Sequence, residues 1–138
     1  MRIRLIRNCS VFVVVFIVLA GCNSSDLALV KGKVTLNGKP VPNGTVNFIP
    51  DNPGPSATGE LKPDGTYALT TNKLDDGAKP GTYKVVIVAM EDQSGKLPEE
   101  KSPLPAAIVP LKYTSLATTE LTATVEKKEN TIDFELKK

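Results

Sequence analysis

Most of the chain consists of short stretches in which apolar and polar residues alternate. This pattern argues against a helical fold. From residue 29, Val30, Val34 and Leu36 fall on one face of an extended chain, whereas Lys31 and Lys33 fall on the other. The same two-residue period recurs to the C-terminus, and no helical period does. Six to eight short strands separated by glycine and proline turns are therefore expected, which is typical of an antiparallel β-sandwich.

Residues with turn chemistry bound the expected strands. Asn37-Gly38 predicts a type I′ hairpin, because both central positions of this turn need a positive φ. Pro80-Gly81 precedes the longest expected strand, whose two faces are both apolar over part of its length, so we expect it to be central in its sheet. The expected strands are residues 29–36, 45–49, 57–61, 66–70, 82–89, 116–125 and 132–136.

The N-terminal residues have the order of a secretory signal. Arg2, Arg4 and Arg7 come before the uninterrupted apolar run 11–20. A membrane-spanning helix needs about 20 apolar residues, roughly twice the length of this run. We therefore expect residues 1–21 to be a cleaved signal peptide.

Three small or apolar residues, Leu19, Ala20 and Gly21, come directly before Cys22, an arrangement typical of a bacterial lipobox. We expect the Cys22 thiol to carry a diacylglyceryl group and the new amine an acyl chain such as palmitate. An ordinary signal peptidase cutting after Gly21 is the alternative. The expected organisation is a signal peptide (1–21), a lipidated N-terminus and tether (22–28) and one folded domain (29–138).

The mature chain is nearly neutral. All three arginines lie in the signal, which leaves 14 lysines against 15 acidic residues after cleavage. A surface without arginine, histidine or tryptophan lacks the basic patch that nucleic acids require, so no nucleic-acid partner is expected. Cys9 leaves with the signal and Cys22 carries lipid, so no disulfide is expected within the mature chain.

The residues of a catalytic or metal site are not evident. Without histidine, the usual serine and cysteine arrangements cannot be assembled, so we expect no enzyme and no cofactor. A Ser-Lys pair from Ser94 or Ser102 with Lys96 would lie in a proline-rich loop that does not position it. Adjacent carboxylates at Asp75 and Asp76 suit either a weak calcium site or ordinary turn chemistry, and both interpretations stay open.

The longest connection, residues 90–115, contains four prolines and no sustained period. Connections of this length in a small domain are commonly binding loops or simply mobile. Within this one, residues 106–111 are apolar, and residues 110–113 could dock back on the sheet. We therefore predict that residues 91–113 and the sheet edges bind a partner, with Lys96, Lys101, Lys112 and Tyr113 as the candidate contact residues.

Aromatic residues indicate core packing more than ligand stacking. Phe48, Tyr67, Tyr83 and Phe134 all fall on the inward phase of their strands. Tyr113, in the long connection, is the one aromatic residue outside the strands that could instead stack on a sugar. Glycan-array binding that disappears in Tyr113→Ala would favour such a glycan-binding role.

Turn residues and core positions form motifs along most of the mature chain. They are residues 30–40 and 43–48, the Asp64-Gly65-Thr66-Tyr67 turn, the Gly-x-x-Pro-Gly-x-Tyr-x-Val strand at 77–88, and the endings 108–113, 121–125 and 130–136. Together these motifs resemble those of carboxypeptidase regulatory-like, or transthyretin-like, domains. The resemblance covers nearly the whole mature chain. It implies a seven-stranded Greek-key β-sandwich of the transthyretin (prealbumin) type, used as an accessory module and, in small bacterial lipoproteins, largely without an assigned activity.

These predictions describe a lipoprotein of the bacterial cell envelope, anchored to a membrane on its periplasmic or extracellular side. The expected function is a non-catalytic module for protein interaction or envelope structure. A glycan-binding or adhesion module is the alternative. The expected partners are membrane lipid through Cys22 and an envelope protein or glycan.

Overall fold

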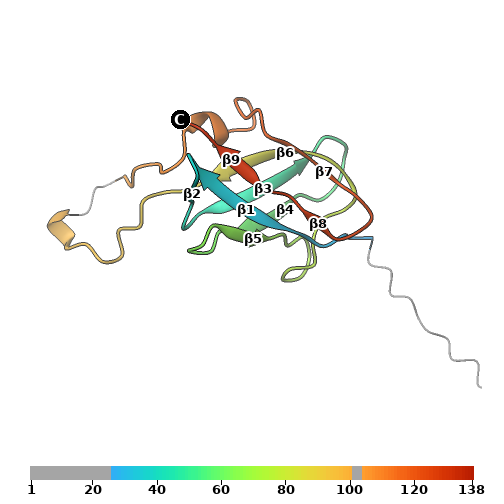
Figure 1. Cartoon of the computed structure of the whole chain (residues 1–138), viewed down its shortest axis with the longest axis horizontal. Helices are drawn as coiled ribbons and strands as arrows, with labels where there is room; N and C mark the ends of the chain where they lie inside the picture. The colour runs from blue at the N-terminus through green and yellow to red at the C-terminus, as the bar shows by residue number, and fades with distance from the viewer. Residues whose placement is uncertain (1–25, 101–103) are drawn as a thin grey trace, which may run out of the picture.

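Two β-sheets make up most of the computed structural model, which describes residues 26–100 and 104–138 (Figure 1). The strands are β1 (Val30–Leu36), β2 (Lys39–Pro40), β3 (Thr45–Pro50), β4 (Ala57–Glu60), β5 (Thr66–Ala68), β6 (Gly81–Val88), β7 (Thr122–Val125), β8 (Asn130–Thr131) and β9 (Phe134–Leu136). Two short 3-10 helices, η1 (Pro98–Glu100) and η2 (Leu111–Tyr113), lie between β6 and β7. The all-β architecture agrees with the expectation from the alternating pattern.

The first sheet is built around β1. This strand pairs with β2 and β5 in antiparallel fashion and with β8 and β9 in parallel fashion. Val30 and Val34 point into the core, and Lys31 and Lys33 are exposed, as the two-residue period predicts. At its end, Asn37 (φ 50°) and Gly38 (φ 81°) form the expected two-residue turn into β2, because both have the positive φ that a type I′ turn needs.

The second sheet has the order β4-β3-β6-β7, and all its pairs are antiparallel. The longest strand, β6, therefore lies between two neighbours, as predicted from its apolar faces. Tyr83, Val85 and Ile87 point into the core, and Val86 on the opposite face is also buried.

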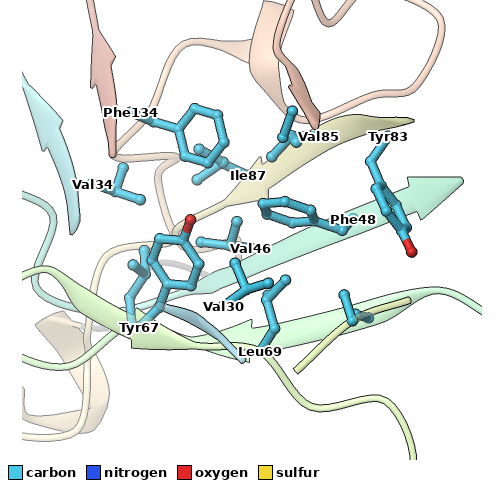
Figure 2. Packing of buried hydrophobic residues seen from close by; sticks show 14 of the residues in the cluster. Val30, Val34, Val46, Phe48, Tyr67, Leu69, Tyr83, Val85, Ile87 and Phe134 are labelled. Carbon is cyan, nitrogen blue, oxygen red and sulfur yellow. The ribbon is translucent and has the colours of Figure 1, made fainter. Parts of the chain in front are cut away.

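Aromatic rings fill the space between the two sheets (Figure 2). The ring centroid of Phe48, on β3, lies 6.4 Å from Tyr67, 5.7 Å from Tyr83 and 6.0 Å from Phe134. These three residues come from β5, β6 and β9, so one side chain contacts strands of both sheets. Separations of about 4.5–7 Å are typical of favourable aromatic pairs.

The structure differs from the sequence prediction in strand number and direction. The described residues form nine strands instead of seven, since β2 is an additional short strand and the expected strand 132–136 is replaced by β8 and β9. The expected strand 116–125 shortens to β7. The prediction of an antiparallel sandwich is confirmed for the other strand pairs but is wrong for β8 and β9, which run parallel to β1. The chain enters β8 from β7 in the other sheet, so no hairpin imposes an antiparallel direction.

Candidate interaction surface

The predicted binding loop divides into a projecting arm and a packed segment. At the base of the arm, Met90 and Ala107 form an isolated β-bridge, and the Glu91 N–H donates to the Ala106 carbonyl at 2.8 Å. We call residues 91–106 the arm. Figure 1 shows the described part of the arm leaving the end of β6 and extending away from the sheets, with η1 far from the core. The described arm residues, 91–100 and 104–106, therefore lie outside the sandwich.

Exposed apolar side chains are concentrated in and around the arm. Among the described residues, five of the seven large hydrophobic side chains that are exposed lie between positions 90 and 116 of the sequence. They are Met90, Leu97, Leu104, Leu111 and Leu116. The arm also carries four acidic residues against Lys96 and Lys101, so its surface combines apolar and negative character.

Local hydrogen bonds order the first half of the arm. The Asp92 carboxylate accepts the Ser94 N–H at 2.8 Å, and this backbone bond lowers the pKa of Asp92 below its usual range. Lys96 pairs with Glu91 at 3.1 Å, so its ammonium group is already engaged. Lys101 lies outside the described residues.

Tyr113 belongs to the packed segment and not to a free surface. Its side chain is buried in the core cluster, and its hydroxyl donates to the Lys137 carbonyl at 3.2 Å. The Lys112 ammonium lies 4.9 Å from the centroid of the same ring. Tyr113 is thus the fifth core aromatic residue, and the expectation that it could offer a stacking surface is wrong.

The Asp76 carboxylate is used by the backbone of its own loop. Its two oxygens accept the N–H groups of Thr71, Asn72 and Lys73 at 2.7, 3.0 and 2.8 Å. Partial burial acts to raise its pKa, but these three bonds outweigh burial and the net pKa is lowered. Neighbouring Asp75 has a positive φ of 56°. This geometry is the turn chemistry named as the alternative to calcium, and no group of three potential metal ligands occurs among the described residues.

The lipobox residues Leu19, Ala20, Gly21 and Cys22 lie outside the described residues. The described chain begins at Asp26, and Figure 1 shows this first segment (blue) at the opposite end of the sandwich from the arm. Across residues 26–100 and 104–138, the structure contains no helix with the length and apolar character needed to span a membrane.

Sequence reasoning placed the arm and the packed segment in one candidate binding region, but it also marked residues 110–113 as a segment that could dock back on the sheet, and the burial of Tyr113 confirms that docking. The sequence does indicate the limits of the arm. The acidic, proline-rich stretch is flanked by small and apolar residues, at 89–90 on one side and at 106–109 on the other. Those flanks pair with one another, and the Ile108 N–H donates to the Ala89 carbonyl at 2.8 Å. Comparison of the chain with protein-family models, curated proteins and solved structures found no match.

Proposed function

We propose that this chain is a lipid-anchored, non-catalytic module of the bacterial cell envelope that binds a protein partner through its arm. The anchor is supported by the order of arginines, apolar run and lipobox before Cys22. A non-catalytic role is supported by the absence of histidine from the sequence. We further propose that the sandwich is of the Greek-key, transthyretin-like type that the sequence motifs resemble.

The arm is the observation that carries this proposal. Leu97 is 57% exposed on the described part of the arm, and Met90 at its base is 44% exposed. Exposed apolar side chains grouped on one element, together with charged residues, are typical of protein-binding surfaces. With the first described residues at the other end of the sandwich, an N-terminal anchor would leave the arm pointing away from the membrane (Figure 1).

Cross-linking mass spectrometry on intact cells tests the proposal. The native protein is compared with the double variant Leu97→Ser/Leu104→Ser, whose two leucines lie in the arm. We expect one envelope protein to be recovered through cross-links at Lys96, Lys101 or Lys112. Recovery should fall about tenfold in the double variant, because losing two contact leucines removes at least 1.4 kcal/mol of binding free energy.

Leu74→Ser is the matched control, because Leu74 is 86% exposed but lies in the loop between β5 and β6. Its recovery of the partner should equal that of the native protein. Cys22→Ala, which cannot be lipidated, should lose the partner if anchoring places the two proteins together. Equal recovery by the native protein and the arm variant would refute binding through the arm.

A further inference from the structure

A second surface lies at the end of the sandwich where the described chain begins. Here an open pocket of about 650 Å³ is lined by the first described residues, the β6 entry and the turn after β7. Leu29 contributes an exposed apolar side chain (54% exposed) and Pro80 an apolar ring. Lys79, Lys127 and Lys128 line the same pocket, together with the acidic residues Asp26 and Glu129.

The cations of this pocket are not all neutralised by neighbouring acids. The pocket residue Glu129 pairs with Lys31, which does not line the pocket, and the pocket residue Lys128 pairs with Glu126. Within the part of the chain that the structure describes, no salt bridge reaches Lys79 or Lys127. Two ammonium groups beside an exposed leucine suit the interface between anionic headgroups and acyl chains, where apolar and cationic side chains are both favoured.

Chain length places this pocket close to the proposed anchor. Cys22 precedes Asp26 by four residues, and an extended chain spans at most about 3.6 Å per residue, or roughly 14 Å here. The attraction of a lysine to an anionic membrane extends over about one Debye length, roughly 8–10 Å. A lipidated Cys22 therefore holds Lys79 and Lys127 within or near the range of the headgroup charge.

We propose that this pocket and its rim form a membrane-docking surface that binds the anionic phospholipid headgroups of the anchoring membrane. The inference rests on the proposed lipidation of Cys22, and it adds an orientation. The pocket faces the bilayer, and the arm faces away from it. Docking also restricts rotation of the domain about its tether, so the arm is presented in one direction.

Amine acetylation of the mature, lipidated protein in vesicles tests this surface. Vesicles of pure phosphatidylcholine are compared with vesicles in which about one third of the lipid is phosphatidylglycerol, and the acetylation rate of each lysine is read by mass spectrometry. We expect Lys79 and Lys127 to react about fivefold more slowly in the anionic vesicles, the ratio that corresponds to the usual attraction of one lysine to an anionic surface. In about 1 M salt the difference should disappear.

Lys39 and Lys84 are the internal references, because Lys39 lies on β2, at the arm end in Figure 1, and Lys84 is exposed in the middle of β6. In the variant Lys79→Gln/Lys127→Gln, the slower acetylation of Lys128 in anionic vesicles should be lost. In the control variant Lys39→Gln/Lys84→Gln, which loses the same charge, the slower acetylation of Lys128 should remain.

Flotation of the vesicles distinguishes failure of the proposed lipid anchor from failure of the proposed docking surface. A chain that floats with both kinds of vesicle but shows equal acetylation of Lys79 and Lys127 in both supports the anchor and overturns the docking surface. Slow acetylation of these two lysines in both kinds of vesicle would likewise overturn recognition of anionic lipid. A chain that floats with neither refutes the anchor and the docking surface together.

Discussion

At the residue scale, one glycine leaves room for the break between β8 and β9, where the sequence predicts a single strand. Gly32 lies on β1 opposite the junction between β8 and β9, where the Ile132 carbonyl turns inward. A Cβ at position 32 would overlap that carbonyl oxygen. The Tyr67 hydroxyl donates to the same oxygen at 2.6 Å, so the inward carbonyl is hydrogen-bonded. The alternating pattern alone assigns Ile132 to an ordinary strand position, because it contains no information on this long-range contact.

Gly32→Ala should destabilise the protein by about 3 kcal/mol, since the overlapping atoms belong to backbone that cannot move without breaking β8 or β9. Urea unfolding followed by circular dichroism measures the change in the free energy of unfolding. Gly54→Ala is the control, because a Cβ at position 54 would make only an ordinary contact, 3.9 Å from the Asn52 carbonyl oxygen, and should change stability by no more than about 0.5 kcal/mol. A Gly32→Ala variant as stable as this control would contradict the contact.

The Tyr67 hydroxyl predicts a pH dependence of stability. Burial raises its pKa above the ordinary value of 10.0, with the charge of Asp133 as a smaller cause. The unfolded phenol ionises above about pH 10 while the folded one stays protonated, so the folded state binds more protons and stability falls as pH rises. Tyr67→Phe should be less stable than the native protein by about 1 kcal/mol at pH 8. This difference in the free energy of unfolding should shrink above pH 10. Chemical denaturation at pH 8 and above pH 10 measures it, and a difference that stays constant would contradict a raised pKa of the buried Tyr67 hydroxyl.

At the scale of elements, the loop between β5 and β6 is organised by a single carboxylate. Asp76 accepts three backbone N–H groups that no strand satisfies. The loop begins where β5 stops pairing with β1 and Thr70 instead bridges to Thr58, on β4 of the other sheet. The Asp76 bonds therefore stabilise the loop beside the bridge that links the two sheets.

Asp76→Ala should lower the free energy of unfolding by about 2 kcal/mol at neutral pH, because three hydrogen bonds to a charged acceptor are lost. The lowered pKa of Asp76 means that this contribution is fully present above the unfolded pKa near 3.8 and is lost as pH falls through the folded value. The difference between the native and Asp76→Ala proteins should therefore shrink below pH 4. Asp51→Ala, at an exposed position, is the control and should change the free energy of unfolding by no more than about 0.5 kcal/mol at neutral pH.

At the scale of the whole molecule, the arm is separable from the fold and the packed segment is not. None of the described arm residues belongs to the buried core, whereas Val109 and Tyr113 do. Replacing residues 92–105 by a short Gly-Ser linker should leave the melting temperature nearly unchanged while partner recovery is lost. Tyr113→Ala should instead destabilise the protein by about 3 kcal/mol, because it removes a buried aromatic side chain. Calorimetry of both variants checks this division, and a linker variant that unfolds more easily than Tyr113→Ala would contradict it.

Strand positions, inward-facing residues and the first hairpin could be predicted from the sequence by itself. The two-residue period assigns Val46 and Phe48 to the core, and Asn37-Gly38 permits few turns other than type I′. These features depend on neighbouring residues, so a local pattern is sufficient to determine them.

Only the tertiary structure decided how the strands pair and where the long connection packs. The contacts of β1 with β8 and β9 join residues about 100 positions apart, and many pairings are compatible with the same alternation. Burial of Tyr113 likewise depends on the space beside the C-terminal residues, where its hydroxyl meets Lys137. Long-range packing selects one arrangement among those that the local pattern allows, and it is this selection that separates the arm from the core and places it opposite the first described residues.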